Sequence, residues 1–145
     1  MNIVIGADHA GFEYAAKLRE YLETEQGDVF QVGAKSTEPY DYPDASDAVA
    51  KSIRDGEATF GVLICGSGIG VCIRANRYFH IRAAQCFTLE MAQLARRHNH
   101  ANVLCLGERT QEYSSCVEIL KAFLETEEDH APRHGQRVNK LDAPL

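Results

Sequence analysis

Hydrophobic residues along the chain gather into five short runs that alternate with longer segments of mixed polarity. Most of the runs are rich in Val, Ile and Leu, and their short length is typical of buried β-strands. They cover residues 2–6, 28–33, 60–65, 81–86 and 102–107. The pattern therefore predicts five strands.

The segments between these runs carry apolar residues at the spacing of amphipathic helices. In TLEMAQLARRH, for example, Met91, Leu94 and Ala95 form one stripe, which we expect to face the core. Thr88 suits the N-cap of this helix, and Pro43 suits the first turn of another. The predicted helices cover residues 12–26, 44–56, 88–98 and 111–125.

Strands and helices in alternation predict an α/β fold of the doubly wound, Rossmann-like class, with a five-stranded parallel sheet between two helical layers. We expect the strand order 2-1-3-4-5. A chain of 145 residues fits one domain over residues 1–145, with an arginine-bearing tail at about residues 126–145. In such sheets ligands bind at the carboxyl ends of the strands, so Asp8, His9 and Arg109 are candidate ligand contacts.

The composition excludes several classes of partner. A net charge of -6 argues against binding to nucleic acid or to an anionic membrane surface, so any anionic ligand should be small. No apolar run approaches the roughly 18 residues that span a bilayer, and we expect a cytoplasmic protein. Five cysteines without a CxxC pair indicate reduced thiols. Three of them suit a role as small buried hydrophobes: Cys86, Cys105 and Cys116.

The stretch ICGSGIG at residues 64–70 puts a thiol before three glycines. A GxGxxG nucleotide fingerprint fails because Val71 stands at its third glycine, and a Walker A loop fails at GAKS, where Ala34 replaces the glycine. A tyrosine-phosphatase-like loop would carry an arginine at position 71, whereas the first arginine is Arg74. The stretch therefore matches none of these phosphate-binding loops.

What remains is a loop of open backbone amides that leads into a helix, a geometry that attracts negative charge. Beside it, Cys65 would be favoured as a thiolate and could accept a proton, and the Ser67 hydroxyl could relay one. The alternative is that Cys65 only packs and the glycines only turn the chain. With a base next to anion-stabilising donors, the loop suits removal of a carbon-bound proton to leave an oxyanion, such as an enediolate.

Seven motifs in this order resemble the ribose-5-phosphate isomerase B family, which also contains galactose-6-phosphate isomerase subunits and allose-6-phosphate isomerases. They run nearly from end to end of the chain: GADHAGFE (6–13), DYPD (41–44), ICGSGIG (64–70), IRAA (81–84), RHN (97–99), NVLCLGER (102–109) and RHGQRV (133–138). The resemblance implies an aldose–ketose isomerase that acts on a phosphorylated sugar through a cis-enediolate. It also implies no metal or cofactor, and a homodimer or tetramer with its sites at the subunit interface.

The resemblance also implies a role for each matching residue. Those with catalytic roles are Cys65 as the general base, Ser67 as the proton carrier between oxygens, and Asp8 and His98 in opening of the furanose ring. The anion hole would be formed by Gly66, Gly68, Gly70 and Asn99. The phosphate would be held by His9, Arg109, Arg133 and Arg137, and Tyr42 would line the sugar pocket.

The residues themselves leave some of these roles open. Arg133 and Arg137 stand four apart, so a helical tail would present both guanidinium groups on one face, although a solvated basic face is the alternative. His98 could equally cap a helix C-terminus. The segment His98-Asn99-His100 makes a weak metal site without an acidic or cysteine ligand nearby, and we reject a metal there.

The sequence departs from the family pattern in three places. Cys72 and Arg74 replace small or neutral residues, His100 replaces an aspartate, and Ala131-Pro132 replaces a glycine pair before the arginine tail.

Ribose 5-phosphate in the pentose phosphate pathway is the expected substrate, with galactose 6-phosphate or allose 6-phosphate as the alternative. A sugar-phosphate-binding subunit without catalysis and a flavodoxin-like nucleotide binder are further alternatives, disfavoured by Cys65 and by the failed glycine motifs respectively.

Overall fold

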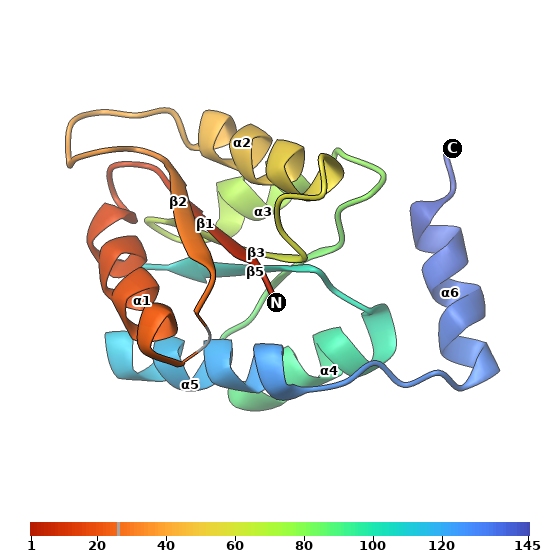
Figure 1. Cartoon of the computed structure of the whole chain (residues 1–145). Helices are drawn as coiled ribbons and strands as arrows, with labels where there is room; N and C mark the ends of the chain where they lie inside the picture. The colour runs from red at the N-terminus through yellow and green to blue at the C-terminus, as the bar shows by residue number, and fades with distance from the viewer. Residues whose placement is uncertain (26) are drawn as a thin grey trace.

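A five-stranded parallel sheet forms the middle layer of the computed structural model, which describes residues 1–25 and 27–145 (Figure 1). Its strands are β1 (Ile3–Ala7), β2 (Val29–Gly33), β3 (Phe60–Cys65), β4 (Ala83–Gln85) and β5 (Val103–Gly107). Every pair of neighbours is parallel. The predicted α/β class is confirmed.

Helices cover both faces of this sheet. On one face α1 (Phe12–Glu25), α4 (Leu89–Asn99) and α5 (Tyr113–Glu125) pack in one hydrophobic core, and on the other α2 (Tyr42–Arg54) and α3 (Ile69–Ala75) pack in a second (Figure 1). A last helix, α6 (Pro132–Asp142), stands beside these layers. The prediction for Gln26, at the end of the first helix, lies outside the described residues. Within the described ranges, no helix has the length and apolar character needed to cross a bilayer.

The predicted strand order is wrong at one edge, because the sheet runs β2-β1-β3-β5-β4. All five residues of β5 are buried, and a strand that is apolar on both faces gains most from neighbours on both sides. β4 has only three residues, all of them half-buried, which suits an edge position. The chain therefore passes from β3 to β4 at the edge of the sheet, and it then returns so that β5 lies between β3 and β4.

The predicted stripe of the fourth helix is also partly wrong. Met91 and Leu94 are each 40% exposed, whereas the side of α4 that is buried carries Ala92, Ala95 and Arg96. Small alanine side chains let α4 approach its neighbours closely, and the Arg96 guanidinium lies 4.6 Å from the centre of the Phe60 ring. Together with Leu89, which is also exposed, these two leave three large apolar side chains of α4 on the surface of the chain.

The loops that follow β1, β3 and β5 meet at one edge of the sheet, as the carboxyl ends of parallel strands must. Main-chain hydrogen bonds join them directly: the amide of Asp8 donates to the Ile64 carbonyl at 3.4 Å, and that of Glu108 donates to the Cys65 carbonyl at 2.9 Å. The Arg109 amide donates to the Gly66 carbonyl at 2.9 Å. These loops therefore form one connected main-chain unit.

Thr88 is the N-cap of α4, as predicted, and offers a test of how the sequence starts this helix. Its hydroxyl oxygen accepts a hydrogen bond from the Met91 amide at 3.1 Å. Thr88→Ala should lower the free energy of unfolding by about 1 kcal/mol, because the amide loses its partner. Thr88→Ser, which keeps the hydroxyl, should stay close to the wild type in urea unfolding. Equal loss in both variants would contradict the capping role.

Candidate active site

Cys65 is the last residue of β3 and lies where the glycine loop begins. Its side chain is nearly buried, and its Sγ accepts a hydrogen bond from the Gly68 amide at 3.1 Å. Gly68 has φ of 79°, a conformation that other residues rarely adopt, and a Cβ there would lie 2.9 Å from the Leu106 carbonyl carbon. Only glycine fits at position 68, and its conformation turns an amide toward the sulfur.

Ser67 stands between the thiol and α3. Its Oγ accepts a hydrogen bond from the Ile69 amide at 3.2 Å, and its carbonyl accepts one from Gln85 Nε2 at 2.7 Å. Gln85 comes from the edge strand β4, and sequence reasoning missed it because nothing in the local pattern ties a strand glutamine to a loop carbonyl. The Gln85 side chain thus ties the glycine loop to β4.

The thiol opens onto a cavity of about 680 Å³, within the range that holds small-molecule ligands. The predicted site residues that line it are Asp8, His9, Tyr42, Cys65, Gly66, Ser67, Gly70 and Arg109. Four further residues complete the lining: Ala10, Ile69, Ile73 and Thr110. Thr110 directly follows the motif that ends in Arg109, so its position in the sequence was a usable signal.

Asp8 and His9 come from the loop after β1. The Asp8 carboxylate is buried and accepts a hydrogen bond from the Gly11 amide at 3.0 Å, just before α1 begins. His9 Nδ1 lies 3.1 Å from the main-chain nitrogen of Tyr40 and 3.2 Å from its carbonyl oxygen. These contacts fix the ring and leave Nε2 as the nitrogen for a ligand.

Tyr42 and Arg109 close two sides of the cavity. Tyr42 is the first residue of α2, and its ring lies against Gly70 so closely that a Cβ at position 70 would overlap it. The Arg109 side chain passes Gly66, with its Nη1 atom 3.5 Å from the place of a Cβ there. Glycine at position 70 makes room for the Tyr42 ring, whereas a Cβ at position 66 would only make ordinary contact with the Arg109 side chain.

The other thiols that were predicted to be hydrophobic are buried, as expected. Burial raises the pKa of Cys86 to about 12 and that of Cys116 to about 11, and it raises the pKa of Cys105 well above its usual value. Charged thiolates are therefore disfavoured at these positions. None of these three thiols lines the cavity onto which Cys65 opens.

Of the other predicted residues, Gly68 does not line the cavity but donates to Cys65 from within the glycine loop. The structure does not bring the remaining four to this cavity. His98 and Asn99 end α4, just before the start of β5, whereas Cys65 pairs with Gly107 at the far end of β5. The five residues of β5 span about 15 Å at roughly 3.3 Å per residue. His98 and Asn99 thus lie at the amino ends of the strands, whereas the thiol lies at their carboxyl ends.

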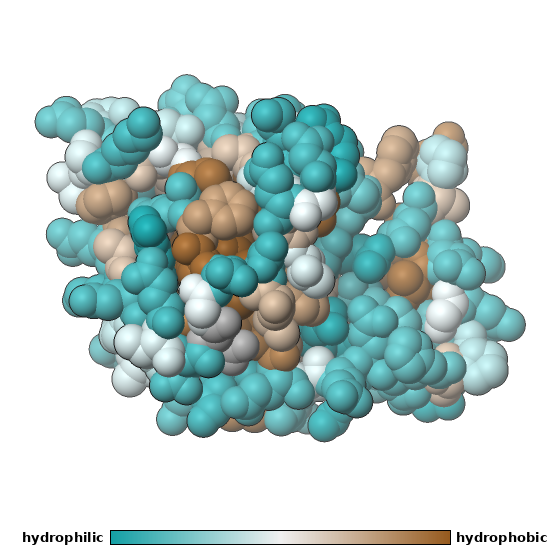
Figure 2. Space-filling model, viewed as in Figure 1, coloured by the Kyte–Doolittle hydropathy of each residue, from teal (hydrophilic) through white to brown (hydrophobic). Residues whose placement is uncertain are grey.

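Arg133 and Arg137 belong with this second group. Both are exposed on α6, which forms the helical tail that their spacing suggested, and α6 packs on the end of α4. The space-filling view shows mostly polar side chains on α6 where it stands beside the body of the chain (Figure 2). Within one chain, the predicted site is therefore divided into a thiol half and a histidine–arginine half.

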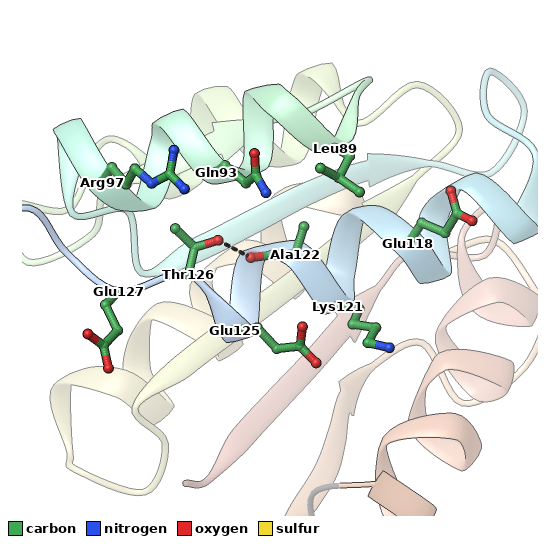
Figure 3. Close-up of a pocket in the computed structure, with 9 residues that line it drawn as sticks. All are labelled: Leu89, Gln93, Arg97, Glu118, Lys121, Ala122, Glu125, Thr126 and Glu127. Atoms are coloured by element: carbon green, nitrogen blue, oxygen red, sulfur yellow. Dashed lines mark hydrogen bonds between the residues drawn. The ribbon is translucent and has the colours of Figure 1, made fainter.

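A second cavity, of about 810 Å³, lies between α4 and α5 (Figure 3). Its charged side chains are Arg97, Lys121 and three glutamates. The Thr126 hydroxyl donates a hydrogen bond to the Ala122 carbonyl at 2.6 Å. None of the predicted site residues lines it. Among the described residues, no group of three His, Cys, Asp or Glu side chains is arranged to hold a metal ion.

Comparison with known proteins gives a consistent result. Residues 3–141 match the family model described as Ribose/Galactose Isomerase. The chain is 37% identical over 142 residues to ribose-5-phosphate isomerase B of Escherichia coli, covering 98% of this chain and 95% of the relative. It is 39% identical over 128 residues to D-erythrulose-4-phosphate isomerase of Pectobacterium atrosepticum, covering 88% and 84% respectively.

The solved structures agree with the sequence comparison. The crystal structure of a ribose 5-phosphate isomerase from Thermotoga maritima superposes with a TM-score of 0.94 at 44% identity, covering 97% of each chain. The chain belongs to the ribose/galactose isomerase family.

Proposed function

We propose that this chain interconverts ribose 5-phosphate and ribulose 5-phosphate, with the Cys65 thiolate as the general base. The observation that carries the proposal is the sulfur of Cys65, which accepts the Gly68 amide at 3.1 Å and lines a cavity that Arg109 also enters. An amide donor stabilises negative charge on the sulfur, and the cation suits a phosphate. The aldose–ketose isomerase activity itself follows from the named relatives.

The proposed reaction moves one carbon-bound proton and one oxygen-bound proton. The Cys65 thiolate takes the proton from C2 of the open-chain aldose, and the electron pair moves through C1–C2 to the carbonyl oxygen, giving a cis-enediolate. The main-chain amides of the glycine loop, residues 66–70, would stabilise that oxyanion. The Ser67 hydroxyl would carry the proton from O2 to O1, and the thiol would return its proton to C1 to complete the ketose.

The divided site supports assembly from two copies of the chain. We infer a homodimer or tetramer in which His98, Asn99, Arg133 and Arg137 of one copy meet the thiol cavity of another. Apolar side chains beside the cavity favour such a cover, because Ile69 is 53% and Ile73 57% exposed in one chain. In this arrangement Asp8 and the partner's His98 would assist ring opening, and arginines of both copies would hold the phosphate.

Five free thiols suit a reducing compartment such as the cytoplasm.

Cys65→Ala should lower the conversion of ribose 5-phosphate to ribulose 5-phosphate at least about 100-fold, because a general base is removed. Cys72→Ala is the matched control, since Cys72 lies nearby on α3 but does not line the cavity, and its activity should stay within about threefold of the wild type. The assay contains a metal chelator and is repeated with allose 6-phosphate. Turnover of allose 6-phosphate alone would move the proposal to a six-carbon substrate, and full activity of Cys65→Ala would refute the thiol base.

Complementation between two inactive variants tests the composite site. Cys65→Ala and His98→Ala, co-expressed, should regain about a quarter of the wild-type activity, because half of the dimers are mixed and one of their two sites is intact. Cys65→Ala with Arg109→Ala should regain none, since both changes fall in the same half. No gain in the first pair would show that both halves act within one chain.

A further inference from the structure

Four of the six histidines in the chain gather where α4, the linker at residues 126–131 and α6 meet. His98 and His134 stack with ring centroids 4.3 Å apart and an interplanar angle of 9°. His100 and His130 form a separate edge-on pair with centroids 5.8 Å apart. The stacked pair joins the histidine proposed for ring opening to a residue with no role so far.

His134 is buried although it belongs to the exposed helix α6. Only 4% of the residue is exposed, and its Nε2 atom has no hydrogen-bond partner, with Asp129 Oδ2 at 3.5 Å. A buried imidazole that forgoes a hydrogen bond is costly unless another contact compensates. In this position the ring gains the flat contact with His98 and the proximity of the Asp129 carboxylate.

The linker holds His134 in register with the end of α4. The Asp129 amide donates to the Arg97 carbonyl at 3.0 Å, and the Asp129 carbonyl lies 3.1 Å from His100 Nε2. Asp129 Oδ1 accepts the Ala131 amide at 2.9 Å, and the Ala131 carbonyl accepts the His134 amide at 2.9 Å. A short chain of hydrogen bonds thus connects the segment before His98 to the ring that stacks on it.

We propose that His134 is a positioning residue that fixes the ring plane of His98. This inference rests on the proposed function, in which His98 assists opening of the furanose ring. Ring opening requires removal of the proton from O1 and delivery of a proton to the ring oxygen, so the acid and base groups must lie in a defined plane. Stacking restrains the His98 ring through its face and leaves both nitrogens at its edge available.

The surroundings of His134 favour the neutral ring. Loss of solvent, and then the nearby His98 and the Arg133 and Arg137 cations, lower the pKa of His134, while Asp129 opposes them. A neutral ring can stack on His98 in either protonation state without repulsion between two cations. The pair can therefore persist while His98 gains and loses a proton.

The test separates ring opening from enolisation. Ribose 5-phosphate closes into a furanose, whereas ribulose 5-phosphate cannot, because the oxygen that would close its five-membered ring carries the phosphate. Exchange of the C1 proton of ribulose 5-phosphate in D₂O, followed by NMR, therefore requires the base but not ring opening.

His134→Ala should slow conversion of ribose 5-phosphate about 10-fold to 100-fold and leave the C1 exchange within about twofold of the wild type. His134→Phe, which keeps a flat ring, should regain most of the conversion. His130→Ala is the matched control from the same linker region and should change neither rate, since its ring contacts His100 instead.

Equal loss of conversion and exchange in His134→Ala would overturn the inference, as would a His134→Phe variant as slow as His134→Ala or a His134→Ala variant with normal conversion. Failure of the proposed function has a different signature, because then either the wild type would not convert ribose 5-phosphate or Cys65→Ala would still exchange the C1 proton. Loss of exchange in Cys65→Ala with retention in His134→Ala supports both.

Discussion

The left-handed turn at Gly68 is the constraint on which the site depends. Position 68 has no room for a side chain against the Leu106 carbonyl, and its φ of 79° is unfavourable for other residues. That turn aims an amide at the Cys65 sulfur and starts α3 directly behind it. At Gly107 the carboxyl end of β5 approaches the carbonyl of Ser67 so closely that a Cβ would lie 2.7 Å from its oxygen. The two loops therefore pack main chain against main chain, and this backbone geometry holds the thiol, with the Gln85 side chain adding a hydrogen bond to the Ser67 carbonyl.

The division of the site follows from the same parallel sheet. The loops after β1, β3 and β5 share the carboxyl edge, while the end of α4 leads into β5 and so lies at the other edge. Under our proposal, the isomerase is complete only when two copies meet, and the exposed apolar side chains of α3 are what the second copy would cover. The linker that docks α6 on α4 would then have two tasks, since it presents the arginines to a neighbouring copy and keeps His98 in place.

The sequence predicted the layers of this fold well because buried strands and amphipathic helices have distinct periods. It did not predict the place of β4, since a strand's period says nothing about its neighbour, and Met91 and Leu94 had the spacing of a core stripe although they lie on the surface. Eight predicted residues line one cavity because most of them end a strand or directly follow one at the carboxyl end of the sheet. The separation of His98 was readable in principle, because a residue that precedes a strand and one that follows its parallel neighbour must lie at opposite edges. The role of His134 was not readable, since its contact depends on how the linker turns.

The most direct test of the central claim, that the sulfur of Cys65 faces the bound sugar phosphate, is alkylation with iodoacetamide followed by peptide mass spectrometry and activity in parallel. Loss of activity should follow the labelling of Cys65 one for one, and ribose 5-phosphate should slow both. The thiols of Cys86, Cys105 and Cys116, which do not line the cavity, should react more slowly. Activity that persists in protein labelled at Cys65, or an inactivation that follows the labelling of another cysteine, would contradict it.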